Sequence, residues 1–115
     1  MDKEVVVLIK SSPQESHRPV EAIRIALGLV SGEHRVSVIL LDKSLLLLGD
    51  TAEDLIDGDE LEKYLLPLRE LDQTFYVERE ALERTKLPDS DYKIKPLSFQ
   101  EISMLIARAD RHLIF

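Results

Sequence analysis

The stretch Val5–Ile9, which reads VVVLI, decides the fold class of this chain. It is continuous, mostly β-branched and bounded by charged and turn-forming residues, which is typical of a strand buried on both faces in a parallel sheet. A helix is expected next, because apolar residues recur at helical spacing from Pro19 up to a C-cap at Gly32. A second buried strand is expected at 36–41. Together these elements predict a β-α-β unit with parallel strands and a right-handed crossover.

Helices and strands continue to alternate along the rest of the chain. A leucine-rich helix or turn is expected at 42–49, and then a helix at 60–71 whose internal Pro67 should kink or end it. Thr51 as N-cap and Asp54 as an acid favoured by the helix dipole precede that helix. The remaining expected elements are a strand at 74–77, helical turns at 78–85, an edge strand at 92–95, a capping box at 98–101 that opens a last helix, and a strand at 112–115.

This order of elements indicates one domain over residues 1–115. We expect a three-layer α/β/α architecture with a five-stranded, mainly parallel, flavodoxin-like sheet. The runs at 5–9 and 36–41 lack polar alternation, so they should lie at its centre, with the strand at 112–115 beside the first.

Composition excludes several classes of function. The 115 residues include 15 Lys and Arg against 22 Asp and Glu, a net charge of −7, which disfavours nucleic acid or an anionic membrane as partner. Cysteine is absent, which removes disulfides, thiolate metal sites and a cysteine nucleophile. Neither a signal peptide nor a membrane span is evident, so we expect a cytoplasmic protein.

The loop after the first strand holds a possible pocket formed by Ser11, Ser12, His17 and Arg18. The loop has no glycine, so it does not match a dinucleotide-binding turn. Weak anion binding beside a helix N-terminus and a simple solvated loop both stay open. A serine hydrolase with His17 as base is a further alternative, although the Gly-x-Ser-x-Gly elbow is missing.

No metal, cofactor or catalytic constellation is predicted. The acidic cluster between residues 50 and 60 lacks the alternating oxygens and the final glutamate of a calcium-binding loop. The three histidines, His17, His34 and His112, have no partner at a metal-ligand interval. Helix caps and a solvated face explain the acidic residues.

The four consecutive residues Leu45, Leu46, Leu47 and Leu48 cannot all face one side of a helix. A domain this small should expose some of them unless a partner covers them, so they are predicted to contribute to an oligomer interface. The alternative is a short segment buried within the chain itself.

Several segments together resemble the DsrE/DsrF-like family of sulfur-relay proteins, and the TusC/DsrF type most closely. They are AIRIALG at 22–28, VSVILLD at 36–42, the leucine-rich segment, FYVEREALER at 75–84, and PLS at 96–98 leading into ADRHLIF at 109–115. The resemblance covers most of the chain. It implies a flavodoxin-like domain that forms a homo-oligomer, or a hetero-oligomer with DsrE-type and DsrH-type subunits.

The resemblance also implies where a persulfide cysteine would stand, just after the third strand. That position corresponds to Val77 or Glu78, neither of which can carry a persulfide, and the family's glycine after the next helical turn is replaced by Thr85 or Lys86. The expected function is a non-catalytic structural subunit of an intracellular sulfur-relay complex. The alternative is a stand-alone homo-oligomer that binds a small ligand or acts outside sulfur transfer. A cysteine introduced at Val77 should be at least partly reachable by a thiol reagent.

Overall fold

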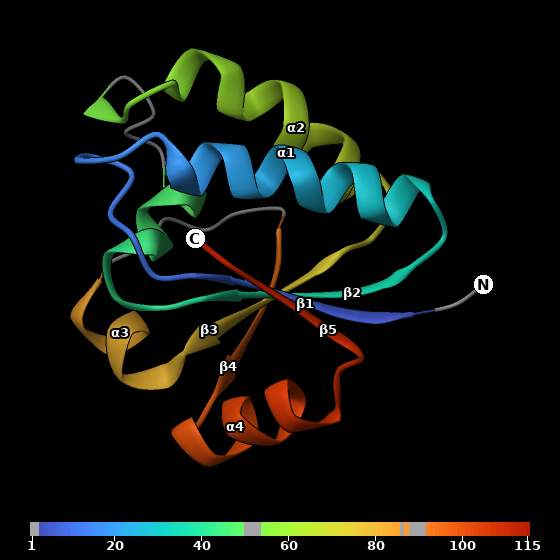
Figure 1. Cartoon of the computed structure of the whole chain (residues 1–115). Coiled ribbons are helices and arrows are strands. Elements are labelled where there is room, and N and C mark those ends of the chain that lie inside the picture. Colours follow the sequence, from blue (N-terminus) through green and yellow to red (C-terminus); the bar gives the residue numbers. More distant parts are fainter. Residues whose placement is uncertain (1–2, 50–53, 86, 88–91) are drawn as a thin grey trace.

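The computed structural model describes residues 3–49, 54–85, 87 and 92–115, and these form a parallel five-stranded sheet between helical layers (Figure 1). The strands are β1 Glu4–Ile9, β2 Arg35–Leu40, β3 Thr74–Glu78, β4 Lys93–Leu97 and β5 Arg111–Ile114. Their order in the sheet is β4-β3-β2-β1-β5, with every neighbouring pair parallel. The α/β fold class is therefore confirmed, and so is the placement of β5 beside β1.

The two faces of the sheet are covered unequally. The helices α1 (Arg18–Ser31) and α2 (Gly58–Glu70) and the 3-10 helix η1 (Asp42–Leu48) pack on one face, and α4 (Phe99–Arg108) packs on the other (Figure 1). The short helix α3 (Arg79–Arg84) follows β3 directly, and its Ala81 joins the core under α1 and α2.

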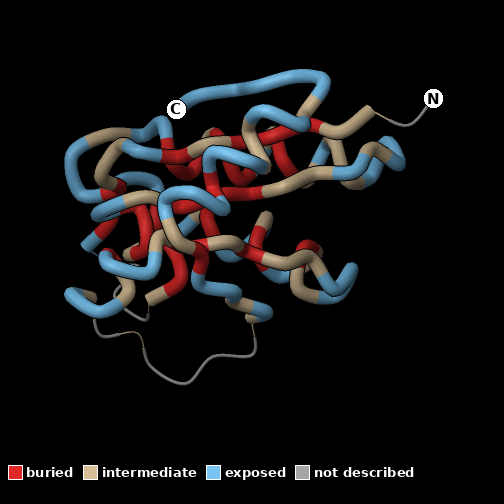
Figure 2. Tube along the Cα trace, turned by 90° about the horizontal axis from the view of Figure 1, so that it is seen from below, coloured by how far each residue is buried: buried red, intermediate tan, exposed pale blue. Residues whose placement is uncertain are grey.

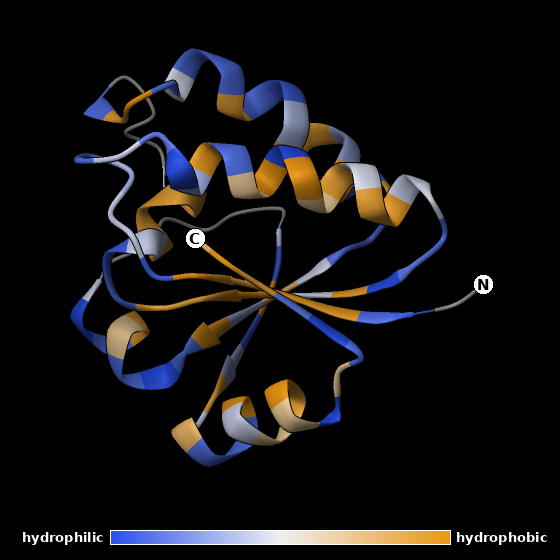
Figure 3. Cartoon of the chain, in the orientation of Figure 1, coloured by the Kyte–Doolittle hydropathy of each residue, from blue (hydrophilic) through white to orange (hydrophobic). Residues whose placement is uncertain are grey.

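Side chains on successive strand residues point to opposite faces, and this alternation creates two cores. Val5, Val7 and Ile9 of β1 join the large core under α1 and α2. Val6, between them, joins the smaller core under α4, which also contains Ile39. Figure 2 shows the buried residues concentrated in the middle of the molecule and the segment running to the C-terminus exposed. Figure 3 shows the corresponding hydrophobic stretches along β1 and β2.

Helix α1 begins and ends close to the expected residues. Pro19 occupies the first turn, where its missing N–H costs nothing, and Gly32 is the C-cap, with its amide donating to the Gly28 carbonyl at 3.0 Å. The left-handed residue that completes the turn is Glu33, with φ 67°.

Helix α2 differs from the expectation at both ends. It begins at Gly58, after Asp57 in the left-handed conformation, and it continues through Pro67 to Glu70. Proline removes one helical hydrogen bond, but Leu65 and Leu68 on either side are buried in the core and hold the segment helical. The expected N-cap at Thr51 lies outside the described residues, as do residues 50–53 of the acidic cluster.

The structure buries most of the leucine run, of which some members were expected to be exposed or covered by a partner. Leu45, Leu47 and Leu48 have at most 2% of their surface exposed, inside the core shared with α1 and α2. Leu46 is half-buried and packs against the same core. The alternative of a buried segment is therefore correct for three of the leucines. Of the four leucines, only Leu46 exposes enough surface to contribute to an oligomer interface.

Candidate functional site

The carboxyl ends of β1, β2 and β3 gather polar side chains at one edge of the sheet. All the strands are parallel, so the loops that follow them emerge on the same side. Ile9 is paired with Leu40 in the sheet register, which brings the residues after β1 next to those after β2. Ligand sites of open α/β sheets form at this edge, so we take it as the candidate site.

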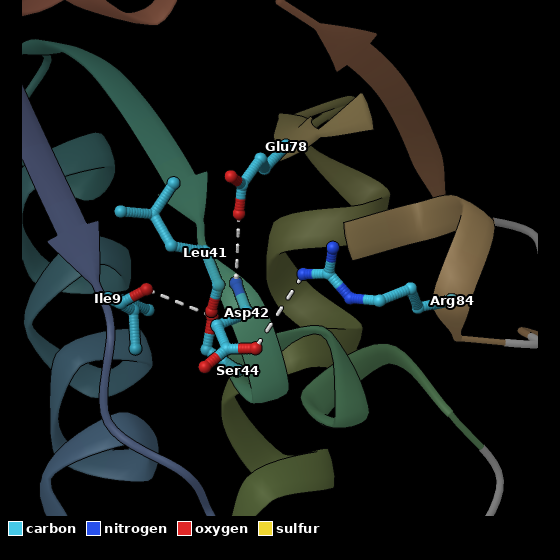
Figure 4. A network of polar contacts seen from close by, with 6 residues as sticks. All are labelled: Ile9, Leu41, Asp42, Ser44, Glu78 and Arg84. Carbon is cyan, nitrogen blue, oxygen red and sulfur yellow. Dashed lines mark hydrogen bonds and ion pairs between the residues drawn. The ribbon is translucent and has the colours of Figure 1, made fainter. Parts of the chain in front are cut away.

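Ser44 ties the segment after β2 to β1. It is fully buried, and its hydroxyl oxygen lies 2.9 Å from the Ile9 carbonyl and 2.6 Å from the Leu41 carbonyl (Figure 4). A buried hydroxyl without a hydrogen-bond acceptor would lower the stability of the fold, and here either carbonyl can accept from the Ser44 hydroxyl. The serine thus holds η1 against the end of the first strand.

Asp42 connects β2 with β3 and α3. Its φ of 51° lies in the left-handed region, which aspartate tolerates better than most residues. Its backbone amide donates to the Glu78 carboxylate at 3.4 Å, and its own carboxylate lies 3.8 Å from the Arg84 guanidinium (Figure 4). The side chains of Arg84 and Asp42 are 59% and 68% exposed, so this ion pair stabilises the fold by no more than about 1 kcal/mol.

A polar depression of about 460 Å³ opens between the loops after β1 and β2. It is lined by three serines, two lysines and two acids: Ser11, Ser12, Ser16, Lys10, Lys43, Glu15 and Asp42. Ser11 and Ser12 were predicted from the sequence. The other five lining residues were not predicted as pocket residues. Asp42 and Lys43 could have been included, because parallel pairing of the first two strands places the residues after β2 beside the loop after β1.

Arg18 and His17 do not line this depression. The Arg18 guanidinium donates to the Ile114 carbonyl at 3.0 Å and lies 5.7 Å from the ring centroid of Phe115, so it is engaged with the strand β5. His17 is exposed as the N-cap of α1, with no capping hydrogen bond from its side chain. The Ser12 hydroxyl accepts from the Gln14 amide, and within the described chain no hydrogen bond joins His17 to either serine.

The two residues proposed for the family's cysteine position differ in accessibility. Val77 is 0% exposed in the large core, whereas Glu78, the last residue of β3 and the N-cap of α3, is half-buried on the opposite face. The expectation that a thiol at Val77 would be reachable is therefore wrong. Glu78 also borders a second depression of about 370 Å³, which extends to Ser98 and Phe99 at the start of α4.

At this edge, the described part of the chain presents serine, lysine and acidic side chains. Among the described residues, no three His, Asp or Glu side chains converge as metal ligands would. No helix among them is long and apolar enough to cross a membrane. The site combines carboxylates, ammonium groups and hydroxyls, which can bind a polar molecule or a protein surface.

Comparison with known proteins identifies the family. No curated protein matches the sequence. Among solved structures, the ychN protein from E. coli superimposes with a TM-score of 0.79 at 18% sequence identity, over 100% of each chain, and so shares the fold. The model of the DsrE/DsrF-like family matches residues 3–115. The chain therefore belongs to the DsrE/DsrF-like family.

Proposed function

We propose that this chain is a non-catalytic structural subunit, of the TusC/DsrF type, in an intracellular sulfur-relay complex with DsrE-type and DsrH-type subunits. Family membership supports a role related to sulfur relay. The observation that carries the non-catalytic part of the proposal is that the whole sequence contains no cysteine.

Sulfur relay through a persulfide requires a thiolate, because that group attacks and then holds the transferred sulfur. The family resemblance puts the cysteine at Val77 or Glu78, the last two residues of β3, and neither an isopropyl group nor a carboxylate can hold sulfur in this way. The two methionines, Met1 and Met104, are thioethers and cannot form a persulfide either. Any sulfur must therefore pass through a cysteine of a partner, while this chain contributes surface and shape.

The direct test is to incubate the isolated protein with a cysteine desulfurase and cysteine labelled at sulfur. We expect no label on the chain after denaturing separation. Label that stays covalently attached would refute the non-catalytic role.

Two matched variants test whether Glu78 occupies the accessible position. Because residue 78 is half-buried and residue 77 is fully buried, Glu78→Cys should react with a thiol reagent in the folded protein and Val77→Cys should not. Both should react once the protein is unfolded in denaturant. Equal reactivity in the folded state would contradict this placement of the site.

Partner subunits are tested by affinity purification of the tagged protein from its native cell, followed by identification of what is retained. The proposal expects cysteine-bearing subunits of the same family in a defined ratio. Recovery of the chain alone would favour the second candidate function.

That second candidate is a stand-alone homo-oligomer that binds a small polar ligand in the depression between the loops after β1 and β2. The ammonium groups of Lys10 and Lys43 and the neighbouring serine hydroxyls support it. A saturable rise in melting temperature with phosphate, sulfate or a small carboxylate, abolished by Lys43→Met, is the expected result. If none of these probes changes the melting temperature, the candidate is wrong for this class of ligand.

A further inference from the structure

The depression between the loops after β1 and β2 is lined by charges of both signs. Lys10 and Lys43 contribute ammonium groups, and Glu15 and Asp42 contribute carboxylates. Among the residues that the structure describes, no ion pair within 4.0 Å joins either lysine or Glu15 to an opposite charge. Asp42 has an ion pair with Arg84 at 3.8 Å, and Arg84 does not line the depression. The positive and negative groups therefore lie around one depression without pairing with each other.

The serine hydroxyls of the first loop can donate hydrogen bonds into this depression. The Ser12 oxygen accepts from the Gln14 amide at 3.3 Å, and the Ser16 oxygen accepts from the Arg18 amide at 3.1 Å. A hydroxyl whose oxygen accepts from an amide still carries a proton to donate. Within the described part of the chain, neither hydroxyl donates to an acceptor. Both protons can therefore go to an oxygen of a ligand.

Hydrogen bonds hold both walls of the depression in place. The Ser12 carbonyl accepts from the Glu15 amide at 3.1 Å and from the Ser16 amide at 3.0 Å, which closes one turn. Residues three and four apart on such a turn are neighbours, so these side chains share one side of it. The other wall, η1, is held against β1 by buried Ser44. A site whose walls are already ordered loses less entropy when a small ligand binds.

Charges of both signs favour a ligand that also carries both. A simple anion is attracted by the two lysines and repelled by the two carboxylates, and a simple cation meets the reverse. A zwitterion can place its carboxylate beside an ammonium group and its own ammonium beside a carboxylate, so that each charge gains a partner. The volume of about 460 Å³ is in the usual range of small-molecule sites and is large enough for a free amino acid.

We propose that this depression binds a free amino acid as its zwitterion. The ligand carboxylate lies beside the two lysines and the serine hydroxyls, and the ligand ammonium lies beside Glu15 and Asp42. The proposal rests on the second candidate function given above, whose ligand class it names. Binding of this kind makes and breaks no covalent bond, so it does not need the cysteine that the chain lacks.

The test follows the backbone amide chemical shifts of the full chain by NMR, at neutral pH, during titration with L-alanine and two derivatives. N-acetyl-L-alanine lacks the ammonium group, and L-alaninamide lacks the carboxylate. L-Alanine should give saturable shifts at residues 10–16 and 42–44, and each derivative should bind at least about tenfold more weakly. Chemical shifts are preferred to the melting temperature, because a solute can also stabilise proteins through exclusion from their surface.

Two variants separate the two halves of the site. Lys43→Met should weaken binding of L-alanine and N-acetyl-L-alanine and leave that of L-alaninamide unchanged. Glu15→Gln should weaken binding of L-alanine and L-alaninamide without weakening that of N-acetyl-L-alanine. Both residues are exposed, so both variants should fold normally, which the dispersion of the remaining amide shifts verifies.

Lys93→Met and Asp72→Asn are the matched controls. They remove one charge of each sign from an ion pair that joins the turn before β3 to the first residue of β4, at the opposite edge of the sheet. Both should bind L-alanine like the wild type. Weaker binding in these controls equal to that in Lys43→Met and Glu15→Gln would overturn the placement of the ligand.

The remaining outcomes distinguish the proposal from the candidate function on which it rests. If N-acetyl-L-alanine binds as tightly as L-alanine, the depression takes simple anions, and the zwitterion proposal is overturned while the second candidate function stands. If L-alanine shifts no amide at residues 10–16 and 42–44, the proposal is overturned as well, and the phosphate and sulfate titrations decide the second candidate separately. The sulfur-labelling result is independent of both outcomes.

Discussion

Leu46 and Leu47 are adjacent in sequence but lie in different surroundings. Leu47 is 1% exposed within the large core, whereas Leu46 is half-buried at its border. Leu47→Ala should therefore lower the free energy of unfolding by about 2–5 kcal/mol, through lost burial and a cavity. Leu46→Ala should cost clearly less. Urea denaturation of both variants measures the difference, and equal losses would contradict the observed packing.

The same two leucines show what can be predicted for single residues. The apolar character of residues 45–48 indicates that they are buried or covered, but four identical residues do not show which side chains point into the core. Contacts of η1 with β1 and α1 decide that, and these contacts are distant in sequence. The sequence predicted helical turns from Glu78 onward, whereas the structure makes Glu78 the last residue of β3, and its hydrogen bond from the Asp42 amide depends on the turn after β2.

At the scale of elements, the capping box at the start of α4 should contribute measurably to stability. The Ser98 hydroxyl accepts from the Glu101 amide at 3.2 Å, and the Glu101 carboxylate accepts from the Ser98 amide at 3.0 Å. Ser98→Ala should lower the free energy of unfolding by about 1 kcal/mol, as loss of an N-cap usually does. Thermal or urea unfolding tests this, with Ser103→Ala on the same helix as the control. An unchanged stability would show that the cap is not needed.

The same box predicts a dependence on pH. The hydrogen bond from the Ser98 amide, followed by that from its hydroxyl, lowers the pKa of Glu101 below its usual 4.5, with a smaller contribution from nearby Arg79. A carboxyl with a lowered pKa in the folded state stabilises the fold fully above its unfolded pKa and loses this effect as pH falls through the folded value. Glu101→Gln should therefore flatten the decline of stability below pH 4.5. Identical acid profiles for wild type and variant would contradict it.

Sequence periodicity predicted which helices and strands form more accurately than it predicted their first and last residues. The strands of the described chain differ from the expected ranges by one or two residues, because period-two alternation and buried apolar runs are local signals. Pro67 was a less reliable indicator of a helix end than periodicity was of a helix. Burial of its neighbours Leu65 and Leu68 outweighs the loss of one helical hydrogen bond. The 3-10 form of η1 carries no signature in the sequence beyond its leucines.

For the whole molecule, the order of elements was sufficient to predict a parallel sheet with β5 beside β1. The sequence could not predict that helices cover one face of the sheet more completely than the other, because this depends on how far α4 extends across the strands. Nor could the sequence show that Arg18 contacts β5 and not the depression. These features arise from contacts between the first and last segments of the chain.

The unequal cover predicts an uneven distribution of local stability, which hydrogen exchange can measure. Strands β1 and β2 each have a neighbouring strand on both sides and buried side chains, so their amides should exchange only through global unfolding. Strand β5 is an edge strand with all four residues exposed, and α4 buries one residue fully, so both should open locally and exchange much faster in dilute protein. Protection of the α4 amides equal to that of the β1 amides would contradict this local weakness of α4.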